Sequence, residues 1–459
     1  MLSRFFYDYV MPLTEPFLFM QLRGVRIDFS ERKRIRDEIE LKRAEAIARV
    51  ESTFPRKIMA KKTISNKALA ELLYEDMKLP VQIKRSTGKM TTDETAMNTL
   101  AGYVTEEHKQ VFEDILYIRD SGVLISTFLE AEIDPDGRLR ASYNIAGTET
   151  GRLSSSESPW WTGTNMQNWQ KYVRNIVVSD RNMIYVYADG EQAEARMVGR
   201  LAKDDVYNAI FDSGEDVHLL MAERIFGIPY DEGLARYKAN PDEFEERDLA
   251  KRTVHANNYG MGVKKFSQII RKNISIAKLL SERYHQEFPG IRDNFQAGVR
   301  QQLESSRLLW NPFGRRRQFF GRMDEELYRK GYAYVPQSTI AEWLDIGCLR
   351  LWKSWKQKLE VPEHDPMCKY LDVREFCDGQ TPLWVEPAIQ IHDGLLTQVP
   401  AGQIRKALPF IQQVLTYPIH LDDGGPLTIP VDIKIGTRWG TLKKPTEDWI
   451  NQCIRDSNR

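Results

Sequence analysis

The chain has 459 residues, of which 42 % are hydrophobic and 28 % are charged, a composition typical of a globular protein with room for a substantial core. It contains no long low-complexity or acidic tract, which argues against disorder as the default state. The 65 Lys and Arg residues balance 65 Asp and Glu residues, so the net charge of zero gives no overall indication of nucleic-acid binding. The length predicts about three domains, at roughly 150 residues each, or one body with several subdomains.

The four cysteines are scattered without paired spacing, which favours reduced thiols and predicts no disulfide framework. A zinc site formed by His364, Cys368 and Cys377 is the less favoured alternative, because three loosely spaced ligands are more often unrelated residues. Prolines and charged residues interrupt the hydrophobic N-terminal stretch, which therefore fits neither a signal peptide nor a membrane span. We expect an intracellular protein without a membrane partner.

Helical patterns dominate the first part of the chain. Residues 29–51 carry dense mixed charge with few helix breakers, and Ser30 is the predicted N-cap of a largely solvent-facing helix. Further helices are expected over about 65–78 and 94–128, on either side of a basic loop at 84–93. This part of the chain is predicted to form a mostly helical arm.

Short strands and loops are expected from residue 129 onward, and the apolar run at 183–190 is the clearest strand. Helices are expected over about 191–305. Two β-rich runs within 388–399 predict a tight hairpin. The order of helical arm, mixed core, helical block and mixed core indicates an α+β protein.

Two aspartates lie at the ends of these predicted strands. Asp189 ends the first strand and is followed by Gly190, and Asp393 lies at the tip of the hairpin. On adjacent strands, the two carboxylates could hold two Mg²⁺ ions about 3.5–4 Å apart and support in-line displacement at phosphorus. Aspartate at a turn more often serves the turn alone, so the residues by themselves leave both interpretations open.

The segment 247–260 contains no proline and can form a helix with one functional face. Its members spaced by four are Arg247, Lys251, His255 and Tyr259, which place two cations and then two rings on one broad face. Cations in this position suit a triphosphate, and rings suit a sugar and a base. The pattern alone favours the alternative of a surface helix with unconnected charges.

These stretches resemble, in the right order, the motifs of family A DNA polymerases. DGEQAEAR at 189–196 is similar to motif A, RDLAKRTVHANNYG at 247–260 to motif B, and IHDG at 391–394 to motif C. The resemblance begins at about residue 8 and leaves insertions near 154–164 and 356–385 unexplained. It implies a right-hand polymerase fold with an antiparallel-sheet palm, a helical thumb and helical fingers. The implied division is palm start at 1–29, thumb at 30–128, palm with motif A at 129–210, fingers with motif B at 211–335 and palm with motif C at 336–459.

The resemblance further implies a template-directed DNA polymerase that adds dNTPs to a primer 3′ end by two-metal-ion phosphoryl transfer. Two Mg²⁺ ions, with Mn²⁺ as a substitute, would be held by Asp189, the carbonyl of Gly190 and Asp393. Lys251 would also donate a proton to the leaving pyrophosphate, and Glu194 would obstruct a 2′-hydroxyl and so select deoxynucleotides. The implied nucleotide-binding residues are Arg247, Lys251, His255, Tyr259, Glu194 and Gln192.

Other similar segments imply contacts with primer-template DNA. They are TETGRLSSSESPWWTGTNMQN at 148–168, WNPFGRRRQF at 310–319 and PQSTIAEWL at 336–344. The DNA-binding residues that they and motif C imply are Arg152, Asn165, Gln167, Asn168, Arg315, Arg316, Gln337 and His392. In the basic loop, duplex phosphates would contact Lys84, Arg85 and Lys89. Trp160 and Trp161 either cover the duplex or, as the favoured alternative, fill an insertion.

The chain departs from the family pattern at three positions. Gly190 stands where a bulky residue is usual, His255 replaces Phe or Tyr, and Gly394 replaces the Glu of motif C. We expect an altered rate rather than an inactive protein, with a catalytically dead descendant as the alternative. A single-subunit RNA polymerase and a non-catalytic DNA-binding relative are the rival classes; Glu194 argues against the first, and the retained catalytic residues argue against the second.

The segment MPLTEPFLFMQLRGVRID at 11–28 already resembles the start of the palm. We therefore expect no 3′–5′ exonuclease domain in this chain, with a separate exonuclease or processivity proteins as partners. The compact form resembles phage or mobile-element enzymes, which predicts the cytoplasm of a bacterium or of a phage-infected host cell. Replication, repair and lesion bypass stay open as biological roles.

Overall fold

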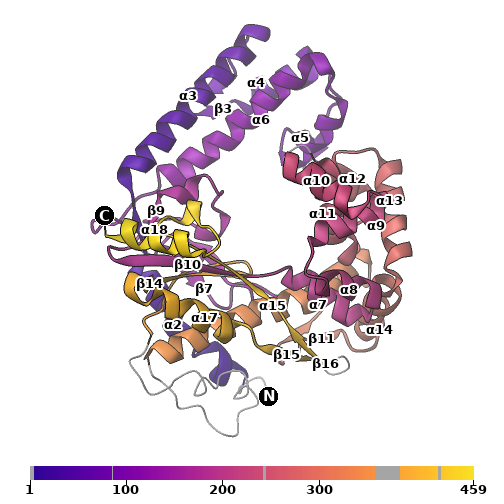
Figure 1. Cartoon of the computed structure of the whole chain (residues 1–459). Helices are drawn as coiled ribbons and strands as arrows, with labels where there is room; N and C mark the ends of the chain where they lie inside the picture. The colour runs from indigo at the N-terminus through magenta and orange to yellow at the C-terminus, as the bar shows by residue number, and fades with distance from the viewer. Residues whose placement is uncertain (1–4, 85, 241–243, 357–382, 422–424, 459) are drawn as a thin grey trace.

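The computed structural model describes residues 5–84, 86–240, 244–356, 383–421 and 425–458. A body built on a four-stranded sheet lies at the centre, a long helical arm rises from one side of it, and a block of short helices lies on the other side (Figure 1). The expected α+β class and the expected order of arm, core, block and core are both observed.

The arm is formed mainly by α3 (Phe29–Thr53) and α6 (Lys109–Leu124), which pack along each other. An ion pair between Arg49 and Asp114 (2.7 Å) joins the two helices. The prediction of Ser30 as N-cap is wrong: the Asp28 carboxylate accepts the N–H of Glu31, and the Ser30 hydroxyl donates to that same carboxylate. The shorter elements of the arm are β2 (Met59–Ala60), β3 (Thr63–Ile64), α4 (Asn66–Glu71), η2 (Leu72–Asp76), β4 (Ile83–Lys84), β5 (Lys89–Met90), α5 (Glu94–Leu100), η3 (Ala101–Tyr103), η4 (Glu106–His108) and η5 (Ile125–Leu129). The outer half of the arm has a hydrophobic core of its own, around Leu72, Ile115 and Ile118.

The central sheet consists of four antiparallel strands in the order β13 (Glu386–Ile391), β14 (Gly394–Pro400), β10 (Met183–Gly190) and β17 (Val431–Gly436). The expected strand at 183–190 is confirmed as β10, and the expected hairpin as β13 and β14. In this register Asp189 lies opposite Gly394 on one side and opposite Asp432 on the other. Two aspartate-bearing turns that are far apart in sequence therefore meet at one end of the sheet.

The two faces of this sheet pack differently. Ile184 and Val186 face the large core, together with α15 (Glu325–Lys356) and α17 (Ile404–Leu415). Tyr185 faces a second core near the base of the arm, where Trp169 and Trp439 stack. Because side chains alternate along a strand, Asp189 lies on the same face as Tyr185.

The remaining elements complete the sheet body and the helical block. The sheet body also contains η1 (Phe5–Val10), α2 (Thr14–Arg23), β1 (Val25–Ile27), β6 (Arg138–Leu139), β7 (Ser142–Asn144), β8 (Ser154–Ser156), η6 (Met166–Asn168), η7 (Val173–Ile176), β9 (Val177–Val178), η10 (Ala401–Gln403), β15 (Pro418–Leu421), β16 (Gly425–Thr428), η11 (Trp439–Thr441) and α18 (Glu447–Ser457). Three of these strands form a small antiparallel sheet in the order β6–β1–β9. The block contains α7 (Ala193–Ala202), α8 (Asp205–Asp212), α9 (Val217–Phe226), α10 (Tyr230–Ala239), α11 (Glu245–Asn258), α12 (Val263–Ile270), α13 (Ile274–Glu287), η8 (Ile291–Gln296), α14 (Ala297–Ser306), β11 (Leu308–Trp310) and β12 (Arg316–Gln318). The helices expected over 191–305 are thus confirmed.

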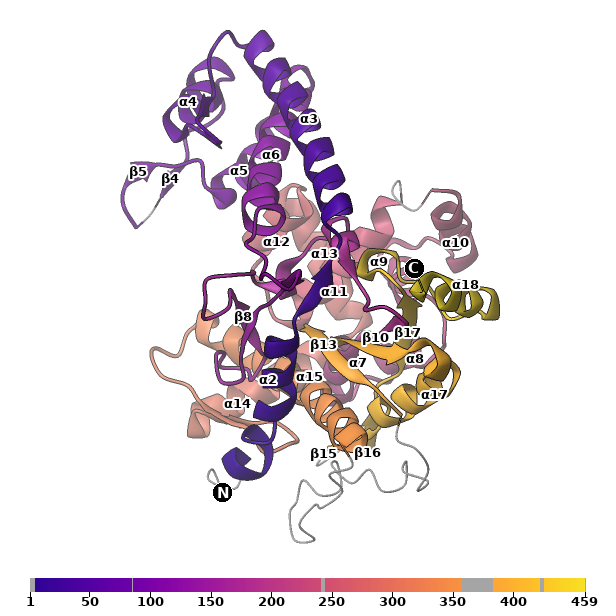
Figure 2. The same cartoon turned by 90° about the vertical axis from the view of Figure 1, so that its left-hand side faces the viewer.

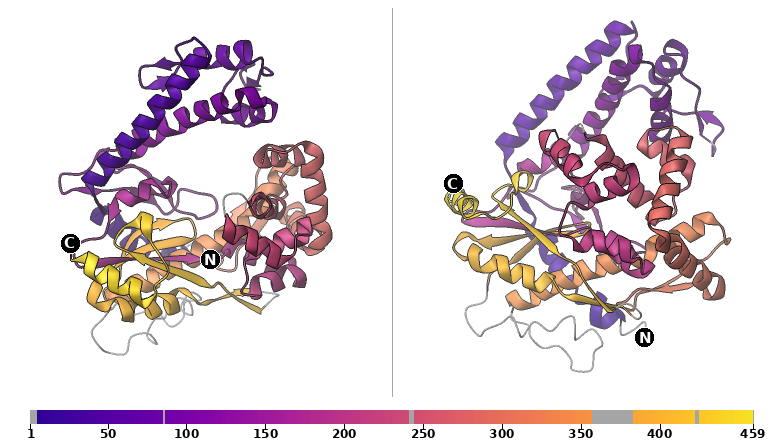
Figure 3. Two further views of the ribbon diagram at one scale, coloured as in Figure 1. Left: turned by 45° about the horizontal axis from the view of Figure 1, so that its top comes forward. Right: turned by 45° about the vertical axis from the view of Figure 1, so that its right-hand side comes forward.

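The far end of the arm turns back toward the helical block, and the β4–β5 hairpin projects from it (Figures 2 and 3). The contact is made by Gln268 on α12, whose side-chain amide donates to the Thr99 hydroxyl on α5 (3.2 Å). Within the described ranges, none of the helices combines the length and the apolar character needed to cross a membrane.

Candidate active site

The centre of the candidate site is the pair of aspartates at the end of the sheet. The N–H of Gly190 donates to the carbonyl of Asp393 (3.1 Å), which fixes the hairpin tip against the end of β10. His392 adopts a left-handed conformation (φ 52°) that permits the tight turn. The structure therefore brings together the two residues that the sequence placed at separate turns.

The electrostatics of this pair suit a bound cation. Burial and then the charge of Asp393 raise the pKa of Asp189 to about 6, and burial raises the pKa of Asp393 above its usual value. Two carboxylates crowded in this way gain stability as anions when a positive ion lies between them. Their oxygen atoms, with the carbonyl of Gly190, form the hard donor set that Mg²⁺ and Mn²⁺ prefer. The residues present thus fit divalent metal ions.

No third carboxylate joins this pair in a ligand cluster: among the described residues, no group of three His, Cys, Asp or Glu side chains is placed to hold a metal ion. Asp432, opposite Asp189 on β17, instead forms an ion pair with Lys434 (2.8 Å).

The two glycines that depart from the family pattern are explained by aromatic neighbours. A Cβ atom at Gly190 would lie 2.8 Å from a ring carbon of Trp343 on α15. A Cβ atom at Gly394 would lie 2.2 Å from the hydroxyl oxygen of Tyr187 on β10. In both places a ring from elsewhere fills the space that a side chain would need, so neither glycine can be replaced without movement of that ring.

The predicted helix at 247–260 is confirmed as α11, and Tyr259 follows its last residue. Arg247 forms a bidentate pair with Asp216, the N-cap residue of α9, in which Nη2 lies 2.8 Å from Oδ2 and Nε lies 3.3 Å from Oδ1. Lys251, one turn further along, is exposed and makes no ion pair with any residue that the structure describes. His255 and Tyr259 pack edge to face, with ring centroids 5.4 Å apart. The cations and rings thus follow one another along this face as predicted.

Three residues that were predicted to make different contacts meet at the C-terminal end of α11. Glu194 on α7 forms an ion pair with Arg152 and accepts a hydrogen bond from the hydroxyl of Tyr259 (2.5 Å). Gln192, the N-cap residue of α7, has a left-handed conformation (φ 52°) that turns the chain from β10 into this helix. Helix α7 therefore begins shortly after Asp189, and Glu194 on it reaches Tyr259 at the end of α11.

The predicted minor-groove residues have different surroundings. The side-chain amide of Gln167 donates to Gln390 (3.1 Å), whose own amide donates to the carbonyl of His392, so Gln167 lies against the hairpin of β13 and β14. The side chain of Asn165 caps η6 by accepting the N–H of Gln167, whereas Asn168 is exposed.

Arg315 and Arg316, which were both predicted to bind DNA, have different surroundings. The guanidinium of Arg315 forms an ion pair with Glu342 of α15, which is fully buried, and only 18 % of the arginine side chain is exposed. The ion pair holds this guanidinium against a buried carboxylate of α15. Arg316 is exposed and lies over the ring of Trp310, and Gln337 is half-buried in α15.

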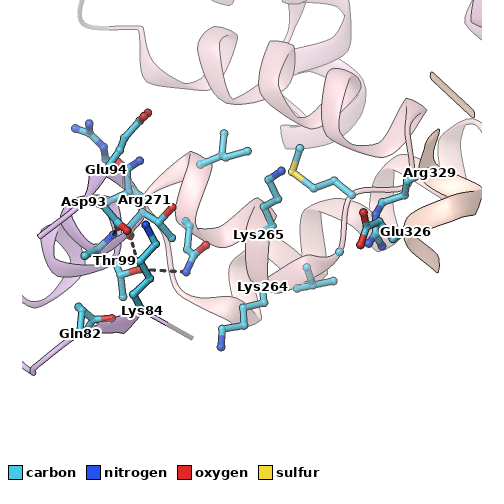
Figure 4. Close-up of a pocket in the computed structure, with 18 of the residues that line it drawn as sticks. Gln82, Lys84, Asp93, Glu94, Thr99, Lys264, Lys265, Arg271, Glu326 and Arg329 are labelled. Carbon is cyan, nitrogen blue, oxygen red and sulfur yellow. Dashed lines mark hydrogen bonds between the residues drawn. The ribbon is translucent and has the colours of Figure 1, made fainter. Parts of the chain in front are cut away.

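A cavity of about 1730 Å³ lies between the end of the arm and the helical block (Figure 4). The cavity extends to Tyr259 and therefore reaches the C-terminal end of α11. Of the basic loop, Lys84 lines it, Lys89 is exposed on β5, and Arg85 lies outside the described residues. The block contributes Arg252, Lys264, Lys265 and Arg271, and the beginning of α15 contributes Arg329 and Lys330. None of these cations was predicted from the sequence as a site residue.

The remaining predictions concern the insertions. Trp160 and Trp161 are 63 % and 79 % exposed, so the favoured prediction that they fill space inside an insertion is wrong. The zinc alternative at His364, Cys368 and Cys377 lies outside the described residues. Four residues around the site were not predicted from the sequence: Tyr187, Trp343, Asp216 and Gln390. Only Tyr187 had a local signal, its position two residues before Asp189 on the same strand.

The antiparallel sheet with its aspartate pair, the helical arm and the helical block define the right-hand polymerase fold. Residues 33–441 match the family model for DNA polymerase family A, and the chain belongs to this family. The expected family and fold are confirmed.

Similar proteins agree with this assignment. The chain is 26 % identical over 446 residues to the thermostable DNA polymerase I of Thermus filiformis, covering 93 % of this chain and 46 % of that protein. It is 25 % identical over 391 residues to DNA polymerase I of Helicobacter pylori (strain J99), covering 83 % and 38 %. Its fold is similar to the POL domain of Pol1 from M. smegmatis in complex with DNA primer-template and dNTP, with a TM-score of 0.76 and 23 % identity, covering 95 % of this chain and 71 % of that one. The chain thus spans about half the length of the curated relatives.

Proposed function

We propose that this chain is a DNA-directed DNA polymerase that extends a primer 3′ end with dNTPs on a template by two-metal-ion phosphoryl transfer. The observation that carries the proposal is the pairing of Asp189 and Asp393 at one end of the central sheet. The membership of the family supports it, and so does the cation-bearing helix α11 beside the site.

The division of the chain follows from the same proposal. The sheet body corresponds to the palm, the arm at 30–128 to the thumb, and residues 211–335, which include most of the helical block, to the fingers. The palm then consists of 1–29, 129–210 and 336–459. In this arrangement the cavity between arm and block belongs to the DNA path.

Asp189 and Asp393 would hold two Mg²⁺ ions, or Mn²⁺ in their place, together with the carbonyl of Gly190. When bound, these ions would activate the primer 3′-hydroxyl and neutralise charge on the phosphates. Lys251 lies exposed one turn along α11 from Arg247 and is placed to bind the triphosphate and to give a proton to the leaving pyrophosphate. Arg247 would exchange the carboxylate of Asp216 for a phosphate oxygen.

Tyr259 and Glu194 would define the place of the sugar and base. The hydroxyl of Tyr259 and the guanidinium of Arg152 both hold the Glu194 carboxylate, so its position is fixed before a nucleotide arrives. A carboxylate held in this way can occupy the volume of a 2′-hydroxyl. We therefore infer that the site selects deoxynucleotides.

Primer extension tests the proposal directly. The purified chain is incubated with a labelled primer-template in Mg²⁺ and either dNTPs or rNTPs. Template-dependent extension with dNTPs is the expected result. Extension with rNTPs alone would instead favour a single-subunit RNA polymerase, and DNA binding without extension in Mg²⁺ or Mn²⁺ would favour a non-catalytic relative.

The same assay with a mismatched primer end measures proofreading. We expect these 459 residues alone to leave the mismatched 3′ nucleotide in place. Its removal by pure protein, before any extension, would contradict this expectation.

Glu194→Ala is expected to raise the ratio of kcat/KM for an rNTP to that for the matching dNTP by about tenfold or more, equivalent to about 1.4 kcal/mol of lost discrimination. The ratio is the useful quantity, because the substitution also removes the partner of Arg152 and slows both reactions. Glu191→Ala, an exposed glutamate just before α7, is the matched control and is expected to leave the ratio unchanged. An unchanged ratio in Glu194→Ala would exclude the proposed selection.

The cavity predicts a basic contact with DNA phosphates through α12. Replacing Lys264 and Lys265 together by glutamine is expected to weaken primer-template binding at any sequence and to reduce the slope of log K against log salt by about 2. Fluorescence anisotropy over a range of salt concentrations measures both effects. Lys278→Gln, an exposed lysine on α13 outside the cavity lining, serves as the control and should keep the original slope.

A further inference from the structure

Tyr187 lies two residues before Asp189 on β10, so the two side chains leave the same face of the sheet. The hydroxyl of Tyr187 donates a hydrogen bond to Oδ1 of Asp189 (2.9 Å). Within the part of the chain that the structure describes, Oδ2 of Asp189 makes no hydrogen bond. One oxygen of the carboxylate is thus fixed by the phenol, and the other stays open.

Gly394 lies opposite Asp189 on β14, and its space is taken by the same phenol. A Cβ atom at Gly394 would lie 2.2 Å from the hydroxyl oxygen of Tyr187, 2.5 Å from its Cζ and 2.7 Å from Oδ1 of Asp189. The backbone of Gly394 does not need glycine, because its φ lies outside the left-handed region. The close approach of the tyrosine hydroxyl, and of the carboxylate oxygen to which it donates, is therefore what requires glycine here.

We propose that Tyr187 is the positioning residue of the metal-binding carboxylate of Asp189, and that its hydroxyl occupies the place of a side chain at 394. This inference rests on the proposed function, because it assigns the phenol a role in binding the metal ions of that reaction. A hydrogen bond to one oxygen fixes the rotamer of the aspartate and aims its second oxygen into the site. It does so without adding a negative charge beside two carboxylates that already repel each other.

Tyr185 shows how a purely structural tyrosine on the same face differs. Its ring is fully buried, and its hydroxyl donates to the backbone carbonyl of Val178 (2.9 Å). That bond satisfies the hydroxyl within the second core and reaches no functional group. The hydroxyl of Tyr187 instead donates its hydrogen bond to a carboxylate of the candidate site. Tyr185→Phe is therefore a matched control for Tyr187→Phe.

The first test is metal binding without DNA or nucleotide, followed through the EPR signal of free Mn²⁺. Tyr187→Phe keeps the ring and removes only the hydroxyl, and is expected to weaken Mn²⁺ binding about tenfold. Tyr185→Phe is expected to bind like the wild type. In primer extension, Tyr187→Phe should lower kcat at limiting Mg²⁺ with little change in KM for dNTP, and added Mg²⁺ should restore part of the rate. Wild-type Mn²⁺ affinity in Tyr187→Phe would overturn the inference.

The second test addresses the shared space. Gly394→Ala is expected to weaken Mn²⁺ binding because its methyl group displaces the phenol, and Tyr187→Ala combined with Gly394→Ala should lose less affinity than the sum of the two single losses. Thermal unfolding of each metal-free variant shows whether the fold is retained. Additive losses in the double variant would overturn the shared-space argument. Absence of extension by the wild type would contradict the proposed function. The Mn²⁺ titrations test the role of Tyr187 in metal binding independently of that result.

Discussion

Asp393→Asn is expected to reduce the rate of primer extension in Mg²⁺ by about 10³-fold or more. The amide has the shape of the carboxylate and leaves the hairpin and its bond to Gly190 in place, but it supplies no negative charge to a divalent ion. Loss of several kcal/mol of charge stabilisation in the transition state corresponds to a rate loss of this size. Single-turnover extension of a labelled primer measures it without interference from product release.

The variant is not expected to be less stable. Asp189 and Asp393 are crowded anions in the metal-free protein, so removing one charge relieves repulsion and should leave the unfolding temperature equal or higher. Asp432→Asn is the matched control, because this third aspartate lies opposite Asp189 but is paired with Lys434. We expect it to keep most of the activity. Near-normal extension by Asp393→Asn, or an equal loss in Asp432→Asn, would contradict the assignment of two carboxylates.

Local patterns in the sequence were sufficient for the elements that carry the site. The apolar run at 183–190 and the hairpin around Asp393 were predicted because strand and turn signals act over a few residues. Their adjacency was not available from such signals, since about two hundred residues separate them; it came from the resemblance to a family. The helix at 247–260 and the spacing of Arg247, Lys251 and Tyr259 were also predicted from the local pattern, and the resemblance added the roles of these residues.

Long-range packing explains what the sequence did not reveal. Gly190 and Gly394 were identified as departures, but the rings that require them come from Trp343, far along the chain, and from Tyr187. Cap selection at α3 also depended on geometry, because Asp28 and Ser30 are both good caps and only the structure shows that the aspartate accepts the helix N–H. The arginine run at 315–317 looked uniform, yet its members have unlike surroundings. One is buried against Glu342 and the next is exposed.

Arg315→Met is expected to lower the free energy of unfolding by about 3–5 kcal/mol, because it leaves the carboxylate of Glu342 buried without its cation. Asp345, also buried on α15, lies close enough for the charge of Arg315 to oppose the effect of burial on its pKa. One guanidinium thus compensates two buried acids. Urea or thermal unfolding measures the loss, and Arg316→Met, with an exposed guanidinium, is expected to change stability by less than about 0.5 kcal/mol.

A second substitution separates a structural role from phosphate binding. Arg315→Met combined with Glu342→Gln removes both charges and keeps an amide oxygen for the side chain of Asn311, which donates to Glu342 in the native protein. We expect this double variant to regain much of the lost stability, since replacing both members of a buried pair costs less than removing one. DNA binding should respond in the opposite way to stability. Arg316→Met should reduce the slope of log K against log salt by about 1, and the double variant should leave this slope unchanged. A reduced salt slope in the double variant, with no loss of stability in Arg315→Met, would show that Arg315 binds DNA phosphate.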